Sequence, residues 1–77
     1  MPVYYFHVRD EKLLLEDKEG TDLPDLASAF TEARASAREI AADSLKANEA
    51  IDGRQIEIVD ATGTVLGAIP IREVVDR

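Results

Sequence analysis

The feature that most constrains the fold is one long stretch with helical spacing of its apolar residues. This stretch, Asp25–Asn48, is rich in alanine, which loses no side-chain entropy in a helix, and Pro24 and Asp25 suit its first turn. A stripe of residues spaced three to four apart should face a core. Its members are Leu26, Phe30, Ala33, Ala37, Ile40, Ala41, Ser44 and Leu45. A single helix therefore has to cover whatever sheet the flanking segments form.

The residues before the helix predict a hairpin. Val3–Arg9 is β-branched and aromatic, and alternation places Tyr5, His7 and Arg9 together on one face of this strand. Residues 10–11 are predicted to form a tight turn, and Lys12–Glu16 a second strand. The polar segment Asp17–Asp22 is predicted to be a loop.

The residues after the helix predict a second hairpin. Asp52 and Gly53 end the helical segment, Arg54–Asp60 alternates as a strand, and Thr64–Ile69 returns as far as Pro70. Ile71–Val75 forms either a short helical turn on the core or a frayed end. The chain is thus one α+β domain over residues 1–77. It is expected to form a two-layer β-β-α-β-β sandwich with antiparallel strand order 2-1-3-4.

Charge and composition restrict the partners. Nine basic residues stand against 16 acidic ones in a chain of 77, a net charge of −7. Such a surface repels nucleic acid and anionic lipid, so neither is an expected partner. There is no cysteine, no apolar run long enough to span a membrane and no pattern of a secretory signal. We therefore expect a cytoplasmic protein.

Few residues suit chemistry. His7 is the one imidazole, and no nucleophile or second ligand stands near it in the sequence. The acidic residues between Glu16 and Asp25 lack the spacing of a calcium-binding loop, so a solvated loop is the expectation. We expect no enzyme activity, no metal and no cofactor.

The proportions of the elements predict self-association or another protein partner. A helix of about 24 residues is longer than a seven-residue strand, and a small domain has little core to spare. We expect a homodimer or another protein contact through either the open sheet face or the end of the helix. The candidate surface residues are Tyr5, His7, Arg9 and Val59 on that face, and Leu45 on the helix.

Several short motifs resemble a family of short, uncharacterised bacterial proteins with a domain of unknown function. They are Tyr5-Phe6-His7-Val8-Arg9-Asp10, Asp17-Lys18-Glu19-Gly20, Leu23-Pro24-Asp25, Ala33, Ala37, Asp52-Gly53-Arg54 and Pro70. The family often has Asp-Gly in the first hairpin turn, where this chain has Asp10-Glu11. The resemblance implies no catalytic residue. The middle of the chain, with Asp22-Leu23-Pro24 and Thr31-Glu32-Ala33, also resembles HicB-type antitoxins, although their third strand is missing from this pattern.

Three hypotheses stay open on the sequence alone. The first is a small, acidic, non-catalytic protein that acts through protein–protein contact, as a homo-oligomer. The second is an antitoxin that masks a basic partner, because complementary charge speeds encounter. The third is a binder of a small ligand or anion that uses His7, Tyr5 and Arg9.

Overall fold

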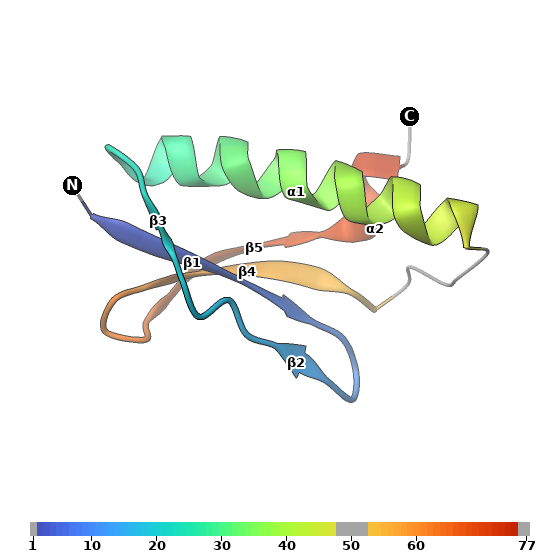
Figure 1. Cartoon of the computed structure of the whole chain (residues 1–77), viewed down its shortest axis with the longest axis horizontal. Coiled ribbons are helices and arrows are strands. Elements are labelled where there is room, and N and C mark those ends of the chain that lie inside the picture. Colours follow the sequence, from blue (N-terminus) through green and yellow to red (C-terminus); the bar gives the residue numbers. More distant parts are fainter. Residues whose placement is uncertain (1, 48–52, 76–77) are drawn as a thin grey trace.

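The protein is a two-layer α+β sandwich. The computed structural model describes residues 2–47 and 53–75. One layer is an antiparallel sheet with the strand order β2-β1-β4-β5. The other layer is the long helix α1, with the short helix α2 beside it (Figure 1). The bounds are β1 Val3–Arg9, β2 Leu14–Leu15, β3 Thr21–Asp22, α1 Leu26–Lys46, β4 Gln55–Asp60, β5 Val65–Pro70 and α2 Ile71–Val75.

The sheet contains the four predicted strands and one more, which lies where the sequence predicts a polar loop. This strand, β3, pairs antiparallel with β1 through Val3↔Asp22 and Tyr4↔Thr21. It lies along the same side of β1 as β2, so the chain from β2 to β3 follows one edge of the sheet. The second strand is also shorter than predicted, because only two of its residues pair with β1.

The predicted alternation of β1 and β4 is confirmed. Phe6 pairs with Ile58 and Val8 with Ile56, and all four belong to or pack against the core. Tyr5 pairs with Val59 and His7 with Glu57 on the opposite face. The face directed at α1 is therefore apolar, and the other face carries the candidate functional residues.

Helix α1 begins at the predicted place and buries an alanine stripe. Asp25 caps it, with its Oδ1 accepting from the Ser28 N–H at 2.8 Å. The buried positions of the helix are Ala29, Ala33, Ala37, Ala41 and Ser44. Small side chains allow the helix to lie close to β4 and β5, over which it packs. Its last helical residue is Lys46, whereas Asn48 and Asp52 of the prediction lie outside the described residues.

Two leucines of the predicted stripe were wrongly assigned to the core. Leu26 is 37% exposed and Leu45 is 61% exposed. Both stand at the ends of the helix, where its buried face passes through Ala29 and Ser44 instead. Ser44 accepts a hydrogen bond from Arg54 Nη1 at 3.2 Å, which compensates for the burial of its hydroxyl.

The last turn of α1 extends beyond the ends of β4 and β5 (Figure 1). Helix α2 lies beside the second half of α1 and contacts it (Figure 1), and Ile71, its first residue, is fully buried. Of the two predictions for the C-terminal segment, the short helix on the core is confirmed over Ile71–Val75.

A glycine in the last strand shapes the contact between helix and sheet. A Cβ on Gly67 would lie 2.5 Å from Cζ of Phe30, so the absence of a side chain leaves room for the Phe30 ring. The strand register between β4 and β5 also shifts here, between Ile58 and Val59. Gly67 therefore allows α1 to pack closely on β5.

Candidate functional site

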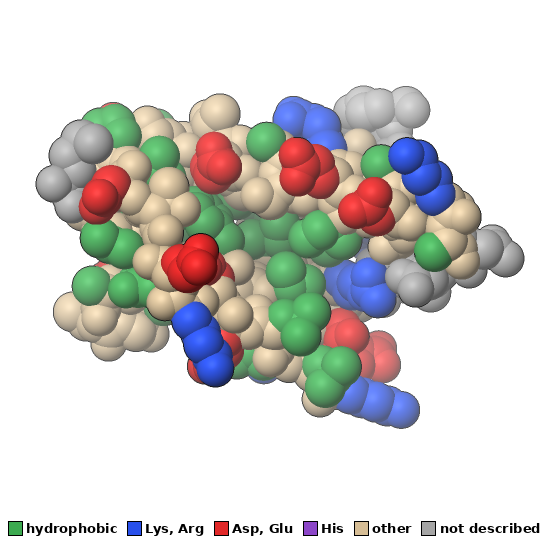
Figure 2. All heavy atoms as spheres, viewed as in Figure 1, with side chains coloured by type: hydrophobic (Ala, Val, Ile, Leu, Met, Phe, Trp, Pro, Cys, Tyr) green, Lys and Arg blue, Asp and Glu red, His purple; other side chains and the backbone are tan. Residues whose placement is uncertain are grey.

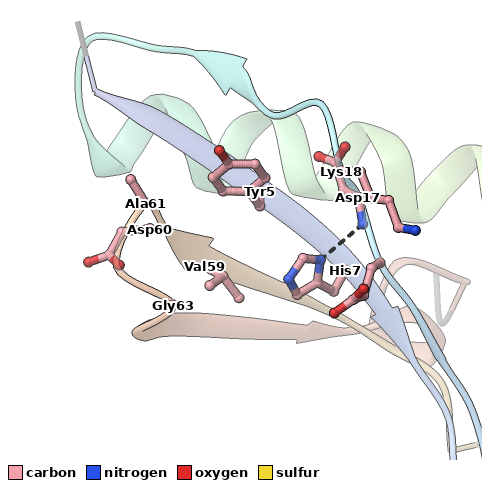
Figure 3. A pocket seen from close by; sticks show the side chains of 9 residues that line it. Tyr5, His7, Asp17, Lys18, Val59, Asp60, Ala61 and Gly63 are labelled. Atoms are coloured by element: carbon pink, nitrogen blue, oxygen red, sulfur yellow. Dashed lines mark hydrogen bonds between the residues drawn. The ribbon is translucent and has the colours of Figure 1, made fainter.

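A shallow pocket of about 220 Å³ lies on the sheet face opposite α1. Tyr5, His7 and Val59 form its floor, and two loops form its walls (Figure 3). One wall is the segment 16–18 after β2, and the other consists of Asp60, Ala61 and Gly63 at the turn between β4 and β5. The sequence predicted an open face here, but the chain between β2 and β3 partly covers it. Val59, at 6% exposure, is buried rather than available as a surface contact.

Asp17 holds this segment against β1. One carboxylate oxygen, Oδ2, accepts from the Phe6 N–H at 3.1 Å. The other, Oδ1, accepts from the N–H groups of Glu19 and Gly20 at 3.1 and 3.2 Å. Desolvation raises the pKa of this carboxyl, but the three backbone hydrogen bonds and the nearby His7 outweigh it and lower the pKa below its ordinary value. Asp17 thus supplies the acceptor that a continuous partner strand would have provided to β1.

Gly20 completes this turn. Its φ of +75° lies in the left-handed region, and a Cβ there would lie 2.6 Å from Cγ1 of Val3. The segment Asp17-Lys18-Glu19-Gly20, which carried part of the family resemblance, is therefore a structural unit that only glycine closes without strain.

His7 is fixed by the same segment. Its Nδ1 accepts a hydrogen bond from the Asp17 N–H at 3.0 Å, the dashed line in Figure 3. A neutral imidazole that accepts at Nδ1 carries its proton on Nε2, so the ring can offer that N–H to a ligand. Tyr5 lies beside it, with ring centroids 6.4 Å apart.

The charges around the pocket limit the chemistry it can support. Three carboxylates line it, those of Glu16, Asp17 and Asp60, against one ammonium group, that of Lys18. Asp60 already accepts hydrogen bonds from Thr62 and Thr64, which lower its pKa. This balance suits a cation better than an anion. The residues lining the pocket include no serine, threonine or cysteine that could act as a nucleophile.

The other two candidate residues lie away from the pocket. Arg9 is further along β1, where its Nε donates to Glu57 Oε2 at 2.7 Å. Leu45 is on α1, in the other layer of the sandwich. The structure therefore brings together Tyr5, His7 and Val59, and it separates them from Leu45.

A second candidate site, which the sequence analysis did not single out, lies at the edge of the sheet. Leu13, Leu14 and Leu15 are 62%, 38% and 63% exposed, and we call them the leucine edge. They belong to the hairpin that ends the sheet on the side of β2, whereas α1 covers β4 and β5. Figure 2 shows hydrophobic side chains in the space between α1 and the strands, continuing to this hairpin. Three consecutive leucines in a strand were the available signal, because alternation turns them to both faces and one helix covers only one face.

Among residues 2–47 and 53–75, no three His, Cys, Asp or Glu side chains are grouped as a metal site requires. In the same part of the chain, no helix has the length and hydrophobicity needed to cross a bilayer.

Comparison with known families confirms the predicted resemblance to a family of uncharacterised proteins. A family model described as "Domain of unknown function (DUF6894)" matches residues 3–72, which is nearly the entire chain. The chain belongs to the DUF6894 family. The match spans every strand and α1, so the DUF6894 domain comprises both the pocket and the leucine edge. No curated protein and no solved structure is significantly similar to the chain.

Proposed function

We propose that this DUF6894 protein is a non-catalytic interaction module that associates with itself through the leucine edge. The observation that carries the proposal is the exposure of three adjacent leucines at the end of a sheet. Exposed edge strands with apolar side chains are templates for pairing, and natural monomers protect them with charges, proline or a covering segment. Here α1 lies over β4 and β5 and leaves the leucines in contact with solvent.

The pocket supports this function less well than the leucine edge. It is shallow, its two aspartates already accept hydrogen bonds within the chain, and its histidine accepts one through Nδ1. These interactions give Asp17 and His7 a role in fixing the segment after β2. That segment directly follows the leucine edge, so the pocket residues hold the proposed contact surface in place.

The test is the molar mass of the native chain measured by light scattering from low micromolar to near-millimolar concentration. We expect a monomer–dimer equilibrium in the micromolar range. Leu15→Lys should raise the dissociation constant by about tenfold or more, because burial of a leucine side chain is worth about 1.5–3 kcal/mol.

Leu45→Lys is the matched control, because Leu45 is 61% exposed and Leu15 is 63% exposed. We expect its dissociation constant to equal that of the native chain. A mass of one chain at every concentration would contradict the proposal. A loss of the dimer in Leu45→Lys alone would move the contact to the end of α1.

A further inference from the structure

Two copies of the sequence around the leucine edge are complementary to one another in antiparallel orientation. It is Lys12-Leu13-Leu14-Leu15-Glu16, an apolar centre with a positive charge before it and a negative charge after it. When this segment pairs with a second copy so that Leu14 lies opposite Leu14, each Leu13 lies opposite the partner's Leu15. In the same register each Lys12 meets the partner's Glu16.

We propose that two copies of this chain pair through β2, antiparallel and two-fold symmetric about Leu14, so that their sheets join into one. This inference rests on the proposed function and specifies how the second copy binds. The joined sheet has the strand order β5-β4-β1-β2 in one copy, followed by the same strands in reverse order in the other.

The backbone of β2 presents the groups that this register needs. The Asp10 N–H donates to the Leu13 carbonyl at 2.9 Å, so the polar groups of Leu13 are directed toward β1. In an antiparallel ladder this direction alternates from one residue to the next. The N–H and carbonyl of Leu14 are therefore directed away from β1, toward the free edge, where two copies of Leu14 can exchange a pair of hydrogen bonds.

The side chains fit the same register on both faces. Leu15 is opposite Val8, which packs against the core, so Leu15 and Leu13 point to the face that carries α1. Leu14 is opposite Arg9 and points to the other face. Because directly opposed residues of an antiparallel pair share a face, Leu13 and Leu15 of the two copies form one cluster between the two α1 helices.

The charges that flank the leucines favour a second copy of this chain over other partners. Each chain carries a net charge of −7, so two copies repel one another as whole molecules. At the edge this repulsion is locally reversed by the two Lys12–Glu16 pairs. One position further out, Glu11 would face the partner's Asp17, which has the same charge. The Asp17 carboxylate is directed toward its own chain, where it accepts hydrogen bonds from three backbone N–H groups.

The test uses charge reversal at fixed ionic strength. Lys12→Glu and Glu16→Lys should each raise the dissociation constant about tenfold, because each replaces two attractive cross-strand pairs with two repulsive ones. An equimolar mixture of these two variants should associate again, because every pair in the mixed dimer is then of opposite charge. The double variant should associate with itself for the same reason.

Arg34→Glu and Glu39→Lys are the matched controls, since they make the same charge changes at exposed positions of α1. They should leave the dissociation constant unchanged. A dimer unaffected by Lys12→Glu and Glu16→Lys, or a mixture that stays monomeric, would overturn the register while the proposed self-association stands. A native chain that is monomeric at every concentration would overturn both.

Amide hydrogen exchange of the native chain gives a second measurement that needs no variant. The Leu14 N–H should exchange more slowly as the protein concentration rises, because it becomes a hydrogen-bond donor in the dimer. A Leu14 N–H whose exchange does not change while the mass doubles would show that the copies associate without pairing β2.

Discussion

Replacing Ile71 with alanine is expected to lower the free energy of unfolding by about 2–5 kcal/mol, the usual range for truncating a buried isoleucine. Ile71 is fully buried, although it lies near the end of the chain. Its N–H donates to the Arg54 carbonyl at 3.0 Å, which ties the start of α2 to the residue before β4. The side chain therefore fixes α2 against α1, and its truncation leaves a cavity in the core. Urea titration followed by circular dichroism measures the change.

Leu45→Ala provides the control for this experiment. Leu45 is a large aliphatic residue of similar volume on α1, but it is mostly exposed. We expect its truncation to change the free energy of unfolding by less than about 0.5 kcal/mol. If Ile71→Ala were equally mild, α2 would contribute nothing to the core.

Asp17→Asn is expected to lower the free energy of unfolding by about 2–3 kcal/mol at neutral pH, because hydrogen bonds to charged groups are among the stronger ones. The native carboxylate accepts from Phe6 through one oxygen and from Glu19 and Gly20 through the other. An amide has a single oxygen, so in either orientation one of these two sets of N–H groups faces an NH₂ group. Chemical denaturation at pH 7 measures the loss, and Asp22→Asn, at an exposed position of β3, is the control.

The same substitution should change the pH dependence of stability. The pKa of Asp17 is lowered in the folded chain, so the unfolded chain takes up a proton at this group more readily. Its contribution is fully present above the unfolded pKa and is lost as the pH falls below about 4. The difference in stability between the native chain and Asp17→Asn should therefore shrink in acid. A difference that stays constant from pH 7 to pH 3 would show that the carboxylate has no such role.

The sequence predicted which residues of β1 and β4 share a face, but it did not predict which parts of the sheet stay uncovered. Alternation along a strand is a local property, so it placed Tyr5, His7 and Val59 on one face. Whether a face is covered depends on segments distant in the sequence. The segment after β2 forms one wall of the pocket above this face, and α1 packs on β4 and β5. Exposure of Leu13 and Leu15 follows from this placement of the helix.

The order of the elements, the two hairpins, the long helix and the faces of β1 and β4 were determined by the sequence itself. Each depends on the spacing of apolar residues within one segment, which acts through neighbours along the chain. Only the tertiary structure decided that Ser44 rather than Leu45 is buried, that Asp17 holds β1, and that three leucines stay uncovered. Those outcomes depend on how a helix is rotated and shifted over a sheet, and contacts between distant segments fix that placement.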